Sequence, residues 1–210
     1  MEPIAGLPNL AGPLGDVTTA RLSLRRFTAS DLDGLASVFA KPEVWRFPYG
    51  RGFTRLETET FLAGQIAHWE TCAVGCWLVE ERETSRIIGY AGLSVPTFLP
   101  EVLPTLEVGW RFDPAVWGRG YATEAARAAL REAFTTLGLD AICSLPQVEN
   151  DASVRVAERI GMRRESVATI AANDRRGAVD AAVFVMSRAE WTASTVSYHH
   201  GAPIQRRSDE

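Results

Sequence analysis

Between residues 116 and 125 the chain reads Val116-Trp117-Gly118-Arg119-Gly120-Tyr121-Ala122-Thr123-Glu124-Ala125. This stretch joins a strand-like run to a long amphipathic helix, and two glycines flank one arginine where the helix begins. The first turn of a helix leaves backbone N–H groups unpaired and carries partial positive charge. Glycines let an anion approach that backbone without a Cβ in the way. The stretch therefore predicts a phosphate-binding turn at a helix N-terminus.

Two common phosphate-binding motifs do not fit this turn. A Walker loop requires Gly-Lys-Ser/Thr, which is absent from the sequence. A dinucleotide fingerprint requires a third glycine where Thr123 stands, and it follows the first strand of a parallel sheet. A glycine turn that only starts a helix is the simpler alternative, but two glycines and an arginine exceed what such a turn requires.

Composition limits the classes of protein to consider. The 210 residues suffice for one domain with a substantial core, and the net charge of −4 argues against a general nucleic-acid binder. Cys72, Cys76 and Cys143 are too few and too irregularly spaced for a disulfide scaffold or a zinc site, and predict reduced thiols. Without a membrane span or signal peptide in the sequence, we expect a cytoplasmic protein with no membrane or nucleic-acid partner and no metal.

The remaining pattern predicts a single α+β, mixed α/β domain with a central, mostly antiparallel sheet. Helices are expected after Thr28, after the Thr54/Glu57 capping box, over residues 122–137 with Gly138 as the stop, and after a cap at Asn150 or Asp151. Strands are expected over residues 19–27, 76–79, 87–93, 105–112, 141–145, 163–169 and 181–187. Residues 1–17, rich in Gly and Pro, are expected to form a flexible arm, and residues 192–210 a disordered tail; the domain spans residues 18–191.

Two blocks of the sequence resemble a known family. Residues 107–112 with 117–125 resemble the acyl-CoA-binding motif of the GNAT N-acetyltransferases, closest to their RimJ/RimL-like branch. Residues 150–162 resemble that family's second CoA-contacting block, and Arg21-Leu22-Ser23-Leu24-Arg25 is typical of the branch's first strand. The resemblance covers roughly residues 18–190. It implies a splayed sheet of about six or seven strands flanked by about four helices.

The resemblance further implies an enzyme that moves an acetyl group from acetyl-CoA, its co-substrate, to a primary amine. The acceptor is either a protein N-terminus or a small amine, and a homodimer is one allowed assembly. The diphosphate and pantetheine of the co-substrate are expected to contact Val108, Gly109, Trp110, Trp117, Gly118, Arg119, Gly120, Tyr121, Ala122, Asn150 and Ser153. Gly109 suits a bulge or splay that would expose strand N–H groups to the thioester carbonyl.

Two positions depart from the common family pattern. Trp117 occupies the first position of the glycine motif, which leaves the backbone donors undisturbed. Ala157 stands where many relatives place a tyrosine that protonates the leaving thiolate, so a tyrosine acid at this position is excluded.

Glu107 is the candidate general base, because a carboxylate in an otherwise apolar strand can have its pKa raised toward neutrality. The alternative, held equally, is a structural partner for a nearby arginine. Ser153 is the candidate acid for the thiolate, with protonation by solvent as the alternative. No cysteine or serine lies in a recognisable activating motif, which favours direct attack in a ternary complex.

The acceptor site is expected at the aromatic and basic segment of residues 43–53. Trp45, Phe47 and Tyr49 are predicted to line it, with His68 of the following helix as a minor candidate base. The alternative is a hydrophobic loop that packs on its own domain. Three other functions remain open: transfer of a larger acyl group such as succinyl, a CoA sensor without turnover, and a nucleotide-binding regulator.

Overall fold

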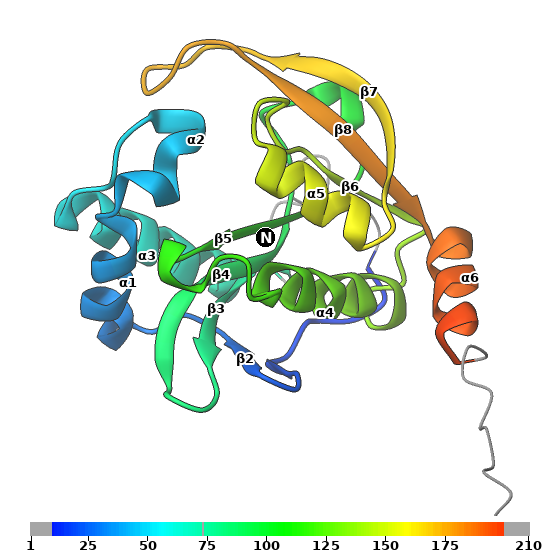
Figure 1. Ribbon diagram of the computed structural model, residues 1–210, viewed down its shortest axis with the longest axis horizontal. Coiled ribbons are helices and arrows are strands. Elements are labelled where there is room, and N and C mark those ends of the chain that lie inside the picture. The colour runs from blue at the N-terminus through cyan, green and yellow to red at the C-terminus, as the bar shows by residue number, and fades with distance from the viewer. Residues whose placement is uncertain (1–9, 73, 200–210) are drawn as a thin grey trace, which may run out of the picture.

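The computed structural model describes residues 10–72 and 74–199, and their strands form one sheet of eight (Figure 1). Its order is β1-β2-β3-β4-β5-β6-β8-β7, and every neighbouring pair is antiparallel except β5 with β6. The strands are β1 (Val17–Thr18), β2 (Leu22–Arg25), β3 (Cys76–Glu81), β4 (Arg86–Ser94), β5 (Glu107–Phe112), β6 (Ala141–Ser144), β7 (Arg163–Ile170) and β8 (Val179–Ser187). The α-helices are α1 (Leu32–Phe39), α2 (Arg46–Tyr49), α3 (Arg55–Thr71), α4 (Tyr121–Thr135), α5 (Asp151–Arg159) and α6 (Arg188–His199).

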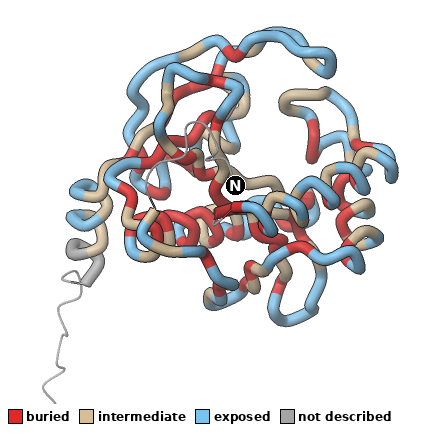
Figure 2. The backbone as a smooth tube through the Cα atoms, turned by 180° about the vertical axis from the view of Figure 1, so that it is seen from behind, coloured by how far each residue is buried: buried red, intermediate tan, exposed pale blue. Residues whose placement is uncertain are grey.

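Helices cover both faces of the sheet. Helices α4 and α5 lie side by side on the near face in Figure 1, and the buried stripe of α4 is mostly alanine, which lets this helix pack closely on the strands. On the opposite face, Phe39 of α1 and Phe61 of α3 contact Tyr90 of β4, with ring centroids 6.0 and 5.3 Å away. Figure 2 shows the buried residues concentrated along the central strands and the inner sides of these helices.

The expected fold class is confirmed, whereas the expected numbers of elements were too low. The described residues contain eight strands and six α-helices. The additional strand β1 has two residues and α2 has four, with Pro48 inside it, so neither is long enough to show a period.

The expected N-terminal arm ends earlier than predicted, and the expected C-terminal tail begins later. Leu14 of the expected arm is 1% exposed, and the carbonyl of Gly15 accepts a hydrogen bond of 2.9 Å from Nε1 of the fully buried Trp77. The expected tail is helical from residue 192 to His199, and Trp191 stacks on Phe134 with ring centroids 5.3 Å apart. Residues 1–9 and 200–210 lie outside the described residues.

Residues 10–72 and 74–199 contain neither a membrane-spanning helix nor a metal-binding cluster. Their helices are too short or too polar to cross a bilayer. Their His, Cys, Asp and Glu side chains do not gather in a group of three or more that could hold a metal ion.

A buried ion network anchors the start of α1 to the sheet. Asp31, 4% exposed, accepts hydrogen bonds from Nη1 and Nη2 of Arg25 (2.9 and 2.7 Å) and from the backbone N–H of Thr28 (2.7 Å). Arg25 also pairs with Glu80 of β3. Burial alone would raise the pKa of Asp31, but the hydrogen bonds from Arg25 and Thr28 outweigh it and lower the pKa.

We expect Asp31→Asn to lower the free energy of unfolding at pH 7 by about 1–3 kcal/mol, since Arg25 loses a charged partner. The pKa of Asp31 is lowered in the folded state, so its contribution exists at neutral pH and is lost as the pH falls through that pKa. Urea unfolding should therefore show a smaller difference between variant and wild type at about pH 3. Asp33→Asn is the control, because its side chain is 85% exposed. Equal losses in both variants would contradict the role of the network.

Candidate active site

The sheet opens between β5 and β6. These parallel strands share one register pair, Glu107↔Cys143, beside which the Cys143 N–H donates to the Leu106 carbonyl at 3.0 Å. Within the described residues, no further pair joins β5 to β6, whereas β5 stays paired with β4 along its whole length. The opening is thus a divergence of two strands, and the alternative of a bulge at Gly109 is wrong because Gly109 keeps a regular pairing with Gly92.

The space in front of Gly109 is open. A Cβ built on Gly109 would meet no atom within 4 Å. Alternation along β5 places Glu107, Gly109 and Arg111 on the same face, opposite to Val108. A group that enters between the diverging strands therefore meets Glu107 and the open surface of Gly109 together.

The predicted phosphate turn has the backbone that the sequence requires. Gly118 (φ 74°) and Gly120 (φ 80°) are left-handed, and Gly120 is the N-cap of α4, so no side chain caps this helix. A Cβ on Gly118 would meet nothing within 4 Å, and one on Gly120 would approach the Arg21 guanidinium at 3.5 Å. The space at Gly118 is thus open, and no side chain caps the first N–H groups of α4, an arrangement that would fit the diphosphate of an acyl-CoA.

Arg21, which the sequence indicated only as part of the first strand, supports this turn. Arg21 donates to the carbonyl of Arg119 at 2.9 Å and to Glu124 at 2.7 Å, and its guanidinium lies 4.5 Å from the ring centroid of Tyr121. Tyr121 is buried and donates to Glu81 at 2.5 Å. Tyr121 therefore anchors the start of α4 to β3, and Arg21 ties the turn to the sheet from outside the glycine motif.

The side chains of Arg119 and Trp117 lie at the surface of the turn. Arg119 is 3.5 Å from Glu81 and stacks over Tyr121 at 5.1 Å, so its contact with a diphosphate stays a prediction. Trp117 is 52% exposed, and its Nε1 donates to the Phe112 carbonyl at 2.9 Å.

Glu107 has the electrostatic properties expected of a base. Burial raises its pKa to about 7, although a backbone hydrogen bond from Leu145 and the charge of Arg111 act in the opposite direction. Burial, with a smaller effect of Glu107, raises the pKa of the Cys76 thiol to about 12 and that of Cys143 as well. The carboxyl of Glu107 therefore has a pKa near neutral pH and lies beside two thiols that stay protonated.

On the other side of the opening, α5 begins with the second predicted block. The Asn150 side chain caps α5 by accepting the Ser153 N–H at 3.2 Å. Both residues are partly buried, and their contacts with pantetheine or sulfur stay predictions. Ala157 is fully buried, so the position that holds a tyrosine in many relatives is part of the core here.

The aromatic segment is more deeply packed than expected. Trp45 is 4% exposed, because Phe53 stacks on one face (3.8 Å between centroids) and the Arg111 guanidinium covers the ring at 4.0 Å. Trp45 is therefore part of the core, its contact with an acceptor stays a prediction, and its buried Nε1 lacks a partner among the described residues. Phe47 and Tyr49 are partly buried, so they remain available to an acceptor.

Arg111, which sequence analysis missed, ties the aromatic segment to the opening. Its Nη1 donates to the carbonyls of Val44 and Phe47. The sequence signal that could have indicated Arg111 is its position two residues from Gly109, on the same face of a half-apolar strand. His68 lies on the last turns of α3 with its Nδ1 3.6 Å from Sγ of Cys72, a contact within its own helix end.

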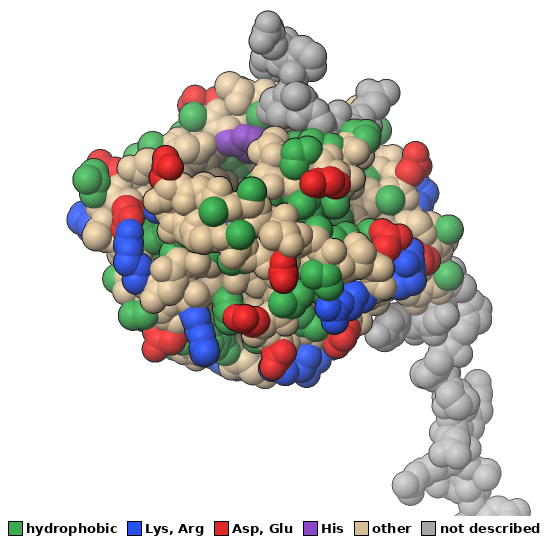
Figure 3. All heavy atoms as spheres, turned by 90° about the horizontal axis from the view of Figure 1, so that it is seen from above, with side chains coloured by type: hydrophobic (Ala, Val, Ile, Leu, Met, Phe, Trp, Pro, Cys, Tyr) green, Lys and Arg blue, Asp and Glu red, His purple; other side chains and the backbone are tan. Residues whose placement is uncertain are grey.

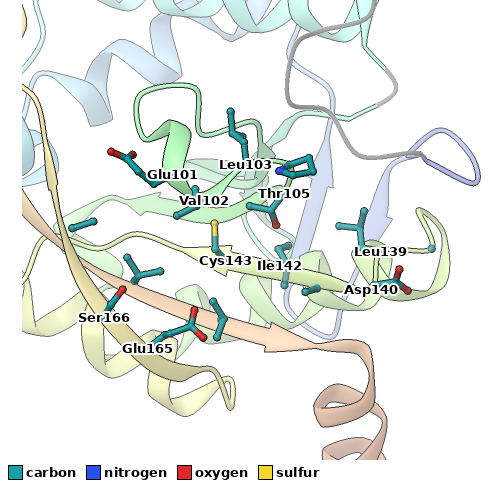
Figure 4. A pocket seen from close by; sticks show the side chains of 16 residues that line it. Glu101, Val102, Leu103, Thr105, Leu139, Asp140, Ile142, Cys143, Glu165 and Ser166 are labelled. Atoms are coloured by element: carbon teal, nitrogen blue, oxygen red, sulfur yellow. The ribbon is translucent and has the colours of Figure 1, made fainter.

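A separate pocket lies elsewhere in the molecule. It has a volume of about 680 Å³ and is lined by the β4–β5 connection and by β6, β7 and β8, with Glu101, Asp140 and Glu165 among its lining residues (Figure 4). None of the predicted site residues lines it. The candidate active site is therefore the divergence of β5 from β6 and not this pocket.

We expect Arg21→Ala to weaken CoA binding several-fold with a smaller effect on kcat, because the turn loses its tie to Glu124 and the sheet. Isothermal titration with CoA measures the effect. The control is Arg164→Ala on the exposed β7. The same affinity in Arg21→Ala and wild type would show that the turn holds its shape without Arg21.

Comparisons with known proteins agree with this geometry. Residues 21–163 match the family model described as acetyltransferase (GNAT) domain. The Bacillus subtilis protein YkkB is 32% identical over 70% of this chain and 84% of its own length, and the uncharacterized N-acetyltransferase YoaA of the same organism is 30% identical over 71% and 83%. An Aspergillus fumigatus protein named FsC-acetyl coenzyme A-N(2)-transacetylase is 33% identical over 69% of this chain and 63% of its own.

Solved structures show the same fold. An acetyltransferase from Agrobacterium tumefaciens superposes with a TM-score of 0.64 at 27% identity, covering 85% of this chain and 98% of that one. A GNAT-family acetyltransferase from Bacillus anthracis gives a TM-score of 0.69 at 24% identity over 83% and 99%. A glycine turn at the start of α4, a sheet that opens beside it and a family match over more than half of the residues agree: the chain belongs to the GNAT family of N-acetyltransferases.

Proposed function

We propose that this enzyme transfers the acetyl group of acetyl-CoA to a primary amine by direct attack in a ternary complex. The observation that carries the proposal is the placement of Glu107, with a pKa near 7, on the same strand face as the open surface of Gly109. Bound acetyl-CoA would supply the electrophilic thioester carbonyl. The name of the Aspergillus relative, an acetyl coenzyme A transacetylase, supports the choice of acyl group.

The chain's residues divide the work of binding. The N–H groups at the start of α4 and around Gly118 and Gly120 hold the diphosphate, and Arg119 adds charge. The backbone of Val108, Gly109 and Trp110, which β6 leaves unpaired, takes the pantetheine and the carbonyl. Asn150 and Ser153, at the start of α5, contact the pantetheine or the sulfur end.

Glu107 takes up the proton that the amine loses as its nitrogen bonds to the carbonyl carbon. The C–S bond then breaks, and the thiolate receives a proton from the Ser153 hydroxyl or from water. An acyl-enzyme on cysteine is disfavoured, because Cys76 and Cys143 have raised pKa values and so carry little thiolate. Direct transfer between the two substrates follows.

We assign the chain to the RimJ/RimL-like branch on its sequence blocks. The strand at Leu22–Arg25 supports this, because Arg21 next to it ties the sheet to the glycine turn, so the two motifs act together. A structural relative from Vibrio fischeri is titled ribosomal-protein-S5-alanine acetyltransferase; at 16% identity it shows the fold alone. The branch leaves a protein N-terminus and a small amine as acceptor classes.

We expect Glu107→Gln to lower kcat/KM by about 10²-fold or more while CoA still binds, because the variant cannot accept the proton. In the wild type, kcat/KM should rise with pH through about 7 as the carboxyl deprotonates, and this step should disappear in the variant. The measurement uses acetyl-CoA and an amine that is already neutral at pH 6, so that the acceptor's own titration does not interfere.

Glu165→Gln, on the exposed part of β7, is the control and should retain the wild-type profile. The same pH step in Glu107→Gln would remove Glu107 from proton transfer. Turnover with succinyl-CoA but not acetyl-CoA, or CoA binding without transfer to any amine, would favour the other functions of this fold.

A further inference from the structure

The tip of the β7–β8 hairpin is a turn held by its own contacts. The Asn173 side chain accepts the backbone N–H groups of Arg175 (2.9 Å) and Arg176 (3.1 Å). Arg176 donates back to the carbonyls of Ala171 and Gly177, both at 3.0 Å. The turn therefore presents Arg175 in a defined position at the end of a long hairpin.

Arg175 reaches the other half of the molecule. Its guanidinium lies 4.9 Å from the ring centroid of Tyr49 and 5.2 Å from that of Phe53. Its Nη2 is 3.4 Å from Oε1 of Glu57, which Arg51 and the Thr54 cap also hold. Figure 1 shows the hairpin arching over to α2 from the far arm of the sheet.

These contacts continue a stack that ends at the candidate active site. Phe53, under Arg175, stacks on Trp45 at 3.8 Å with an interplanar angle of 6°. Trp45 in turn lies under Arg111 of β5, at 4.0 Å. Two guanidinium groups and two rings thus form one column, Arg175–Phe53–Trp45–Arg111, from the hairpin tip to the strand that carries Glu107.

The column joins the two arms of the sheet a second time. The arms, β1–β5 and β6–β8–β7, meet at the Glu107↔Cys143 pair, diverge, and meet again through Arg175. We call the opening between the Glu107↔Cys143 pair and the Arg175–Glu57 contact the window. An acceptor on this side must pass through this window. The face seen from above in Figure 3 is hollowed, with acidic and basic side chains interspersed on it.

We infer that the Arg175 column restricts the acceptor to a small free amine and excludes the N-terminus of a folded protein. The inference rests on the proposed function. A small amine fits through a bridged window, whereas a folded protein must open the bridge before its first residues reach Glu107. The bridge can open, because the Arg175 side chain is half exposed and cation–π and surface ion-pair contacts are individually weak.

The test compares kcat/KM for 2-phenylethylamine, for short peptides with free N-termini, and for a small folded protein with an exposed N-terminus. The wild type should prefer the small amine by tenfold or more over the folded protein, with the short peptides between the two. Arg175→Ala should narrow that preference several-fold by raising turnover of the polypeptides, with unchanged CoA affinity. Arg175→Lys keeps the charge without the planar stack, and its preference for the small amine should lie between those of the wild type and Arg175→Ala.

Arg55→Ala is the matched control, because Arg55 forms an exposed ion pair with Asp33 at the start of α3, outside the column. Wild-type turnover of the folded protein at the rate of the small amine, or an unchanged preference in Arg175→Ala, overturns the inference. Hydrogen exchange at residues 171–178 gives a readout without activity, and faster exchange is expected in Arg175→Ala alone. CoA binding with no acetylation of any amine would instead reject the proposed function, and the acceptor class with it.

Discussion

The candidate active site depends on a parallel pairing that stops after one register pair. Had β5 and β6 continued side by side, the N–H and C=O groups of Val108–Phe112 that point toward β6 would be consumed by the ladder. Because the strands diverge, those groups stay unpaired and can bind a ligand. The sheet is thereby divided into two arms that are joined at Glu107 and Cys143. The same divergence sets Glu107 at the base of the opening, where burial shifts its titration.

The glycine turn completes the site by supplying a second set of unpaired donors. Its left-handed glycines give α4 an N-terminus without a capping side chain, which exposes N–H groups that a serine or aspartate cap would occupy. The turn is not self-supporting, however. Hydrogen bonds and ring contacts of Arg21, Glu124, Tyr121 and Glu81 connect it to β2 and β3, so the position of the turn depends on these two strands.

Arginines link the parts of the acceptor side. Arg111 fixes the aromatic segment by its backbone carbonyls and covers Trp45, and Arg175 meets the same aromatic group from the opposite arm. Within the aromatic segment, Trp45 and Phe53 belong to the core, whereas Phe47 and Tyr49 are only partly buried, and their contact with an acceptor stays a prediction.

The sequence by itself determined the features that depend on near neighbours in the chain. The left-handed turn at Gly118 and Gly120, the Thr54/Glu57 capping box and the common face of Glu107 and Gly109 follow from local geometry and a period of two. Only the tertiary structure decided where β5 diverges from β6 and which carbonyl accepts the hydrogen bond of the Trp77 indole. It also decided how Arg21 and Arg175 contact partners about a hundred residues away in the chain. Short elements such as β1 and α2, and the terminal helix α6, are likewise held by packing and not by their own periodicity. The reason is physical: turn and cap preferences act within a few residues, whereas contacts between distant side chains form only once the core has brought them together.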